Sequence, residues 1–287
     1  MSNVVIMAHH ERQDAWDLAD STAAWLRDRD HEVWMLPRDA MTSHLGHLAA
    51  DRPVGDADLV LSLGGDGTML RAVRLLDGAP VPLLGVNLGR LGYLTEIEAM
   101  SITDALERFE LGAEAGHWHL DERMMLSVVV TGAEGERLGS WKALNEAVVE
   151  KRLSGHTVHL LARIDGEPFT SYAADGLIVS TPTGSTAYSM SARGPIVSPK
   201  HRALLVTPVA PHMLFDRSLV LDPTETVEIE VIGERDASVA VDGRPVCDLE
   251  AGCSVMCTPA SSTARFVRFG AHHYHQVLKA KFGLTDR

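Results

Sequence analysis

The chain has 287 residues, enough for one large domain or two ordinary ones with a sizeable buried core. Its formal net charge of −13 argues against nucleic acid or an anionic membrane as a partner, so an anionic ligand must be held by local arginines, helix N-termini and backbone N–H groups. No apolar run approaches membrane-spanning length, and Asn3 starts the first apolar run without a basic region or cleavage site, so we expect a cytoplasmic protein.

The first hundred residues alternate between short apolar runs and helix-like patterns. Apolar runs predict strands at residues 4–8, 31–36, 58–63 and 81–87. Helices are predicted between strands at residues 14–30 and 69–76. In the first helix, apolar residues recur at helical spacing at Trp16, Ala19, Ala23 and Leu26. This alternation predicts an α/β N-terminal domain with a parallel sheet covered on both faces.

After about residue 114 the pattern changes to strand-like runs joined by Gly, Asp and Pro turns. These runs predict a β-rich C-terminal domain with more than one sheet. Residues 273–283 predict a short amphipathic tail helix with one apolar stripe, formed by Tyr274, Val277, Leu278 and Phe282. We therefore predict an α/β domain at 1–114, a β-rich domain at 115–270 and a tail at 271–287.

Several common motifs are missing from the sequence. Cys247, Cys253 and Cys257 are odd in number and lack C-x-x-C spacing, which favours reduced thiols or small core residues over a disulfide framework or a zinc site. There is no Gly-Lys pair of a Walker A loop, no protein-kinase catalytic loop and no GxGxxG segment. A kinase with this sequence would belong to another class.

The segment GGDGT, residues 64–68, follows the third predicted strand and encloses one acid between glycines. Ligands of open α/β sheets collect beyond the carboxyl ends of strands, and glycines permit positive φ and close approach of N–H groups to phosphate. Asp66 would face the same point, and Thr68 would cap the next helix. A carboxylate beside phosphate is suited to bind a metal ion or to accept a proton, and phosphoryl transfer to a hydroxyl needs both. The alternative is a tight turn in which Asp66 only caps the helix.

A second segment, residues 175–195, is dense in hydroxyl groups and glycine. A predicted strand at 176–180 leads into TPTGST and then into a predicted helix start. Such a turn presents hydroxyls and N–H groups to ribose, base or phosphate, or it satisfies only its own hydrogen bonds. The composition leaves both interpretations open.

Two further segments give weaker signals. Asn145-Glu146 interrupts the apolar run ALNEAVVE, and the pattern alone favours a solvent-facing edge over a buried recognition pair. NLGRLGYL, residues 87–94, is another glycine loop at a strand end. Tyr93 would stack there on a base and Arg90 would meet phosphate, or the loop is an ordinary turn with Tyr93 in the core.

Taken together, these segments resemble the NAD kinase family. GGDGT, NLGRLGYL, the Asn145-Glu146 pair, DGLIVSTPTGSTAYSMSARGP at 175–195 and VDG at 241–243 occur in the order and at about the spacing of that family, over nearly the whole chain. GGDGT alone is shared with lipid and sphingosine kinases, whereas the hydroxyl-rich segment is far more specific. The resemblance implies transfer of a phosphoryl group to the 2′-hydroxyl of the adenosine ribose of NAD, which gives NADP.

The resemblance also assigns roles to residues. Asp66 becomes the catalytic carboxylate, with Gly67 beside it at the ribose, and Gly64, Gly65 and Thr68 complete the phosphate loop. Arg71 matches a basic residue common after GGDGT, and another is expected near His156. The remaining residues implied in substrate binding are Asn145, Glu146, Asp175, Thr183, Thr186, Ala187, Tyr188 and Ser191.

The family further implies a divalent metal, with Mg²⁺ expected and its ligands unknown, and ATP or polyphosphate as phosphoryl donor. It implies a tail that returns to the N-terminal domain, and a homo-oligomer, dimer or tetramer, with Asp175 near a subunit contact. The sequence departs from the common pattern at Ala174, at Arg193, where glycine is frequent, and at Arg244, where glutamine is frequent.

Two rival functions remain at this stage, a GGDGT-type lipid kinase and a non-catalytic dinucleotide sensor with the same fold. The sequence does not fix the donor, the choice between NAD and NADH, the oligomer size or allosteric control. His9 and His10 follow the first strand and either touch the donor or form a plain loop. His272, His273 and His275 lack acidic partners at ligand spacing, which favours surface or interface residues over a metal site.

Overall fold

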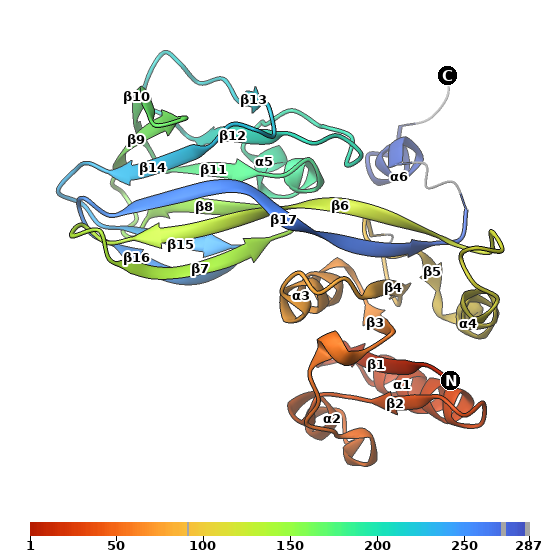
Figure 1. The fold of residues 1–287 in the computed structure, drawn as a ribbon. Coiled ribbons are helices and arrows are strands. Elements are labelled where there is room, and N and C mark those ends of the chain that lie inside the picture. The colour runs from red at the N-terminus through yellow and green to blue at the C-terminus, as the bar shows by residue number, and fades with distance from the viewer. Residues whose placement is uncertain (91, 271–273, 285–287) are drawn as a thin grey trace. The chain divides into compact units, whose positions relative to one another are not determined.

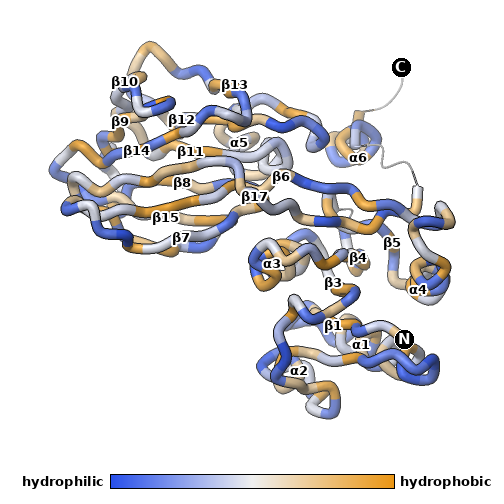
Figure 2. Tube along the Cα trace, in the orientation of Figure 1, coloured by the Kyte–Doolittle hydropathy of each residue, from blue (hydrophilic) through white to orange (hydrophobic). Residues whose placement is uncertain are grey.

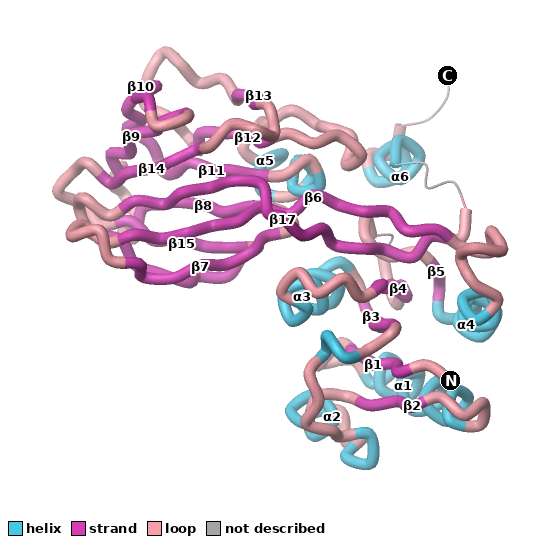
Figure 3. The backbone as a smooth tube through the Cα atoms, in the orientation of Figure 1, coloured by secondary structure: helices cyan, strands magenta, loops and turns pink. Residues whose placement is uncertain are grey.

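The computed structural model describes residues 1–90, 92–270 and 274–284. The chain divides into two compact units (Figure 1), unit 1 with Met1–Glu122 and Ala264–Arg287, and unit 2 with Arg123–Thr263. Helices gather in unit 1 and strands dominate unit 2 (Figure 3), as the change of pattern near residue 114 predicts. Among the described residues, no helix is long and apolar enough to cross a membrane.

Unit 1 contains a parallel sheet. Its strands β1 (Asn3–Ala8), β2 (Glu32–Trp34), β3 (Leu59–Gly64) and β4 (Pro82–Asn87) follow the order β4-β3-β1-β2, and every pair is parallel. The short β5 (Ile97–Glu98) pairs with β4, and so does the end of β17 (Ser254–Arg268). The predicted α/β domain with a parallel sheet is confirmed.

Four helices of unit 1 come from its first 122 residues: α1 (Gln13–Arg27), α2 (Pro37–Thr42), α3 (Asp66–Leu76) and α4 (Ile102–Glu110). Ala15, Ala19 and Ala23 of α1 are fully buried, because small side chains let the helix lie close to the sheet. Trp16 stays half-buried and donates its indole N–H to the His9 carbonyl at 2.9 Å. Helices α2 and α4 are not among the elements predicted from the sequence.

Unit 2 is built of antiparallel strand pairs in two sheets. One sheet has the order β13-β12-β11-β8-β15-β16, and the other contains β10-β9-β14-β17 and the pair β6–β7. Their bounds are β6 (His119–Thr131), β7 (Arg137–Ala143), β8 (Glu146–Lys151), β9 (Val158–Ile164), β10 (Glu167–Ala174), β11 (Gly176–Ser180), β12 (Leu204–Val209), β13 (Leu219–Leu221), β14 (Val227–Val231), β15 (Ala237–Val241) and β16 (Arg244–Leu249). The predicted β-rich C-terminal domain with more than one sheet is confirmed.

One hydrophobic core fills unit 2, with buried residues from both of its sheets, among them Val128, Val149 and Val179. Hydrophobic residues, orange in Figure 2, run along these strands. Cys253 and Cys257 are buried in this core and all three cysteines are free thiols, as the sequence analysis predicts. The one α-helix of unit 2 in the described residues is the short α5 (Tyr188–Ser191).

The predicted tail helix is present as α6 (Tyr274–Lys281), which belongs to unit 1. The Tyr274 ring lies 6.1 Å from the Tyr93 ring, centroid to centroid. Phe282, assigned to the apolar stripe, follows the end of the helix and is half exposed. Residues 271–273 and 285–287 of the predicted tail, His272 and His273 included, lie outside the described residues.

Candidate active site

The GGDGT segment lies where β3 ends and α3 begins, at the carboxyl end of a parallel strand. Its glycines do not have positive φ, and Gly65 is extended at φ −123°, so that expectation is wrong. Gly64 is required by close approach, because a Cβ there would lie 2.3 Å from the Thr68 hydroxyl oxygen. A Cβ on Gly65 or Gly67 would meet nothing within 4 Å, so these two glycines keep space open.

The carboxylate of Asp66 is held by the backbone of a neighbouring loop. Its Oδ2 accepts the N–H of Tyr93 at 2.9 Å and its Oδ1 accepts the N–H of Leu94 at 3.0 Å. Asp66 is therefore no helix cap: the N-cap of α3 is Gly65, which has no side chain, and Thr68 lies in the first turn instead of capping it. Each carboxylate oxygen keeps a further lone pair for a substrate.

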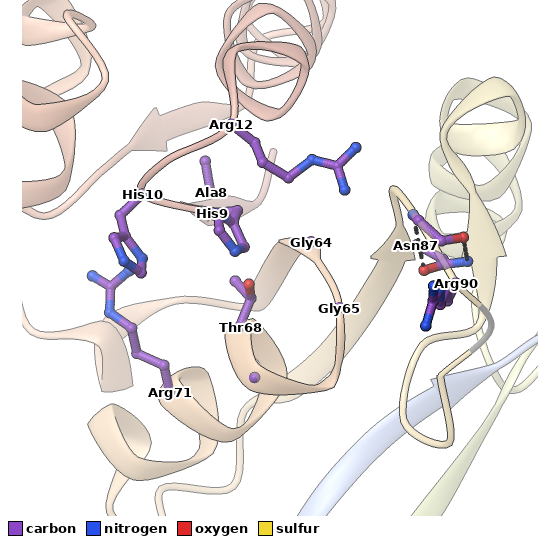
Figure 4. Close-up of a pocket in the computed structure, with 12 residues that line it drawn as sticks. Ala8, His9, His10, Arg12, Gly64, Gly65, Thr68, Arg71, Asn87 and Arg90 are labelled. Atoms are coloured by element: carbon purple, nitrogen blue, oxygen red, sulfur yellow. Dashed lines mark hydrogen bonds between the residues drawn. The ribbon is translucent and has the colours of Figure 1, made fainter.

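A cavity of about 390 Å³ in unit 1 adjoins the GGDGT segment (Figure 4) and is lined by Gly65, Gly67 and Thr68, the neighbours of Asp66. Its ionisable lining residues are all basic: His9, His10, Arg12, Arg71 and Arg90. In Figure 4, Arg71 and His10 extend toward one another on the opposite side of the cavity from Arg90. This cavity is suited to an anion although the whole chain is acidic.

Two of the three arginines have acidic partners behind them. Arg71 forms an ion pair with the nearly buried Asp39 of α2, and Arg12 bonds to Asp14 through its Nε at 2.9 Å. His9 accepts the N–H of Glu11 at Nδ1, which leaves its Nε2 as the donor nitrogen, and its ring stacks on His10. His9 and His10 thus belong to the wall of the cavity.

The loop after β4 lines the basic cavity with its first residues and contacts Asp66 with its later ones. Asn87 exchanges hydrogen bonds with the backbone of Gly89, which shapes the turn that carries Arg90 into the cavity wall, whereas Leu91 lies outside the described residues. Tyr93 is not in a hydrophobic core: its ring contacts Tyr274, and the Lys281 ammonium lies 4.4 Å from the ring centroid. Burial, followed by the nearby Tyr274 and Asp66, raises the pKa of the Tyr93 phenol.

A second group of predicted residues lies in unit 2. The carboxylate of Asp242 accepts the backbone N–H groups of Leu144, Asn145 and Glu146 at 2.8 to 3.1 Å, so it fixes the start of β8. Glu146 is only 5% exposed, and the solvent-facing edge favoured by the sequence pattern is wrong for it. Asp242 has no predicted role, although it lies in the VDG segment of the family resemblance.

Glu146 is a buried acid with an unsatisfied oxygen. Its Oε2 has no hydrogen-bond partner. Burial, followed by the adjacent Asp242 carboxylate, raises the pKa of Glu146 from 4.5 to about 8, opposed by a hydrogen bond from the Tyr188 backbone. The side chain is therefore largely protonated at neutral pH and presents a hydroxyl donor as well as an acceptor.

Part of the hydroxyl-rich segment satisfies its own hydrogen bonds, as one of its two predicted interpretations has it, and ligand binding by the rest stays a prediction. The hydroxyls of Thr181, Ser185 and Ser189 are buried and bonded within unit 2, to the Leu144 carbonyl, the Val197 backbone and Thr207 respectively. Other members remain accessible: Thr186 and Ala187 are half-buried, Tyr188 is 39% exposed and Ser191 is exposed, whereas Thr183 is buried.

Two positions of this segment are fixed by backbone geometry. A Cβ on Gly184 would lie 2.2 Å from the Asn145 carbonyl oxygen, so this glycine brings the hydroxyl segment against the Asn145-Glu146 pair. Arg193 has φ +66°, a left-handed conformation that favours glycine, which gives a physical reason for the glycine that is frequent there in the resembled family.

The remaining predicted residues have other surroundings. Asp175 is ion-paired to Lys151 of β8, with 2.5 Å between Nζ and Oδ1. His156 lines a separate cavity of about 510 Å³ within unit 2, with Lys151, Arg152 and Arg235. Within residues 1–90, 92–270 and 274–284, no group of three or more His, Cys, Asp or Glu side chains is arranged to hold a metal ion.

Comparison with known proteins points in one direction. Residues 4–113 match the ATP-NAD kinase N-terminal domain, and residues 144–269 match the ATP-NAD kinase C-terminal domain. An NAD kinase of Heliobacterium modesticaldum is 39% identical over 283 residues, 98% of each chain. An NAD kinase of Syntrophotalea carbinolica is 37% identical over 291 residues, 100% of each chain.

Solved structures agree with this match. The yeast NADH kinase complexed with NADH has a TM-score of 0.89 and 25% identity, covering 100% of this chain and 89% of that one. An NAD kinase from Archaeoglobus fulgidus in complex with ATP has a TM-score of 0.72 over 99% of both chains, and at 23% identity it speaks for the fold alone.

Proposed function

Because the chain belongs to the NAD kinase family, and so phosphorylates NAD, we propose that Asp66 is the carboxylate that accepts the proton of the ribose 2′-hydroxyl. The observation that carries this proposal is the pair of N–H bonds from Tyr93 and Leu94, which orient the Asp66 carboxylate beside a basic cavity. The 2′-oxygen attacks the terminal phosphorus of the donor, a new O–P bond forms, the bond to the leaving phosphate breaks, and the proton passes to Asp66.

The donor phosphates fit the basic cavity of unit 1. Three arginines supply positive charge, and the arginines and the two histidines supply hydrogen-bond donors. The N-terminus of α3 adds its backbone N–H groups, and the bare glycines 65 and 67 leave room for phosphate oxygens. We take ATP as the donor, with polyphosphate as the alternative, and Arg71, Gly64, Gly65 and Thr68 as its contacts.

A divalent metal, with Mg²⁺ the expected ion, fits the donor set at this cavity. Mg²⁺ is usually bound by one or two carboxylates together with substrate phosphates and water, so a site without three acidic side chains is no obstacle. Asp66 is the carboxylate that would share it with the donor. Once bound, the metal would neutralise developing charge on the transferred phosphoryl group.

All the dinucleotide-binding residues of the proposal except Gly67 lie in unit 2. Asn145 and Glu146 have a backbone fixed by Asp242, and the protonated Glu146 offers a hydrogen bond to an acceptor of the dinucleotide. Exposed or half-exposed groups of the hydroxyl-rich segment complete the set, namely Thr186, Ala187, Tyr188 and Ser191, together with Thr183, Asp175 and His156 and with Gly67 of unit 1.

The setting of the protein is also a proposal. Free thiols at Cys247, Cys253 and Cys257 suit a reducing compartment such as the cytoplasm. Exposed apolar side chains of unit 2, among them Leu153 and Leu214, favour a homo-oligomer, dimer or tetramer, with Asp175 near the subunit contact. Light scattering coupled to gel filtration measures the oligomer size.

The decisive experiment replaces Asp66 by Asn, which keeps the size and polarity of the side chain but takes up no proton. We expect kcat to fall at least a hundred-fold, because general-base assistance is typically worth about 10²- to 10⁴-fold. Turnover is measured as NADP formed from NAD, and as NADPH formed from NADH, with Mg²⁺ and ATP or polyphosphate. Calorimetric titration measures NAD binding to the same variant.

Each outcome of this experiment decides between functions. Lost turnover with retained NAD binding and an unchanged melting temperature supports Asp66 as the base. Near-normal turnover of the variant would mean that the GGDGT segment is only a turn and that Asp66 is not the base. Lost binding makes Asp66 a recognition residue, and the absence of any turnover in the unaltered chain would favour a dinucleotide sensor.

A further inference from the structure

The loop that holds Asp66 is itself held by the C-terminal end of the chain. We call residues 92–96 the anchor loop, since the N–H groups of Tyr93 and Leu94 fix both oxygens of the Asp66 carboxylate. Gly92 of this loop lies so close to Asp66 that a Cβ there would come within 2.2 Å of Oδ1. A small displacement of the anchor loop therefore displaces the carboxylate.

Arg268, at the end of β17, fixes one side of the anchor loop. Its side chain is 0% exposed, and its Nη1 donates to the carbonyls of Leu94 and Thr95 at 3.2 and 3.4 Å. The same nitrogen lies 2.9 Å from the Glu96 carboxylate, whose other oxygen accepts the N–H of Phe269. Three contacts of Arg268 and one of Phe269, the residue after β17, thus hold residues 94–96, and none of them involves Tyr93.

Helix α6 contacts the other side of the anchor loop through Tyr93. The Tyr274 ring lies 6.1 Å from the Tyr93 ring at an interplanar angle of 38°, and the Lys281 ammonium lies 4.4 Å from the Tyr93 centroid. Tyr274 and Lys281 are seven residues apart and so share one face of the helix, two turns from each other. Aromatic pairs and ammonium groups over a ring face are attractive contacts, so both hold the Tyr93 ring in place.

We propose that α6 is a clamp on Tyr93 that positions the Asp66 carboxylate for proton transfer, with Tyr274 and Lys281 as positioning residues. The proposal rests on the proposed role of Asp66. It extends the site to a part of the chain some two hundred residues beyond GGDGT.

Because α6 is not buried, its contacts with Tyr93 can be removed without unfolding the protein. No described residue of α6 is buried, so removing its contacts takes little apolar surface out of the core. Arg268, in contrast, is a buried charge with several partners, and its replacement would strongly destabilise unit 1, which would mask any effect on positioning. The side chains of α6 are therefore the right ones to change.

The test uses the full chain with Tyr274→Ala and Lys281→Ala combined. We expect kcat for NADP formation to fall about ten- to a hundred-fold, since a small misplacement of a catalytic group has a large effect on rate. KM for NAD should change less than three-fold, because ground-state binding does not need the proton acceptor. Lys281→Arg in a Tyr274-containing chain keeps the cation over the ring and should retain kcat. Gln276→Ala, an exposed position on the same helix, is the matched control.

Hydrogen exchange of the peptide containing residues 92–96 gives a readout that does not depend on activity. We expect faster exchange of the Tyr93 and Leu94 amides in the double variant, with β1, β3 and the melting temperature unchanged. Unchanged exchange overturns the proposal, and so does faster exchange with normal kcat. A rise in kcat would make α6 an inhibitory contact, and a rise in KM alone would make it a binding element.

The proposed function is tested separately by Asp66→Asn. If Asp66→Asn is inactive while the α6 double variant turns over normally, only the clamp is refuted. If Asp66→Asn itself turns over normally, the role of Asp66 fails, and with it the reason for a clamp, whatever the exchange data show.

Discussion

Gly92 is the residue at which the geometry around Asp66 is most tightly constrained. An added Cβ would lie 2.2 Å from Oδ1 of Asp66, 3.0 Å from its carboxyl carbon and 3.0 Å from the Thr95 hydroxyl oxygen. These neighbours cannot all move away, since the Asp66 oxygens are bonded to the N–H groups next to Gly92. The glycine is thus needed for close approach and not for an unusual φ.

We therefore predict that Gly92→Ala lowers kcat for NADP formation by at least about ten-fold while the protein stays folded, because displacement of a general base weakens its assistance. Steady-state kinetics and circular dichroism check this. Gly46→Ala is the control, since a Cβ there would meet only Met41 at 3.9 Å. Equal activity of the two variants would show that the Asp66 carboxylate tolerates displacement.

Glu146 gives a prediction about stability and pH. Its folded-state pKa of about 8 lies above its ordinary value of 4.5, so the folded protein holds a proton that the unfolded chain releases. Below pH 4.5 Glu146 therefore does not lower the free energy of unfolding. As the pH rises from 4.5 to about 8, ionisation of Glu146 in the unfolded chain lowers the free energy of unfolding progressively. Glu146→Gln mimics the protonated form and removes that decrease.

The Gln variant should match the unaltered chain near pH 4.5 and exceed its free energy of unfolding by roughly 2 to 4 kcal/mol above pH 8. Urea unfolding without NAD, at pH 4.5, 6.5 and 8.5, measures the difference. A difference that stays constant with pH would mean that the pKa of Glu146 does not change on folding.

At the scale of the element, helix α3 contains a glycine, Gly67, that weakens the helix and leaves space in the basic cavity. Gly67 lies in its first turn, is exposed, and has open space where a Cβ would project. Glycine in a helix is less favourable than alanine by up to about 1 kcal/mol. The open space belongs to the basic cavity.

Gly67→Ala should accordingly raise the free energy of unfolding by about 0.5 to 1 kcal/mol and raise KM for the phosphoryl donor several-fold. Thermal unfolding and donor-dependent kinetics are the two measurements. Leu75→Gly, at an exposed position of the same helix, should destabilise the protein without an effect on KM. A stabilised variant with unchanged KM would place the donor phosphates elsewhere.

The elements themselves differ in how well the sequence predicts them. Strands β1 to β4 follow from apolar runs because a parallel sheet buries both faces of each strand. Helix α4 carried the spacing Ile102, Ala105, Leu106 but was missed, and α2 is too short for its pattern to show periodicity. The pairing of β17 with β4 joins residues that are far apart in the chain, which a local pattern does not encode.

For the site, residue types and motif order predict Asp66 and the hydroxyl-rich segment. The way in which Asp66 is held could not be predicted, because its partners are backbone N–H groups, and every residue type except proline has one. The same holds for Asp242, which acts on three backbone N–H groups at the start of β8. Contacts of α6 with Tyr93 depend on the tertiary fold.

At the scale of the whole molecule, the net charge of −13 bears on the lipid-kinase alternative. Anionic vesicles repel a protein with this net negative charge. We predict that the chain phosphorylates NAD and neither diacylglycerol nor sphingosine. Radiolabelled ATP with each acceptor, and sedimentation with phosphatidylserine vesicles, test this. Labelled lipid without NADP would contradict it.

The division of unit 1 between the two ends of the chain has a consequence for biosynthesis. The edge of β4 at Pro82 and Leu83 pairs with Arg265 and Phe266, which leave the ribosome about 140 residues after Glu122. At typical rates of translation, that interval lasts roughly 10 to 30 s. During this interval, the edge of β4 is open to pairing with other chains. Glu96 and Asp121 also lack their ion-pair partner, Arg268, until it is synthesised. In a nascent chain that stalls before residue 264, this edge of β4 therefore stays unpaired and exposed to aggregation with neighbouring chains.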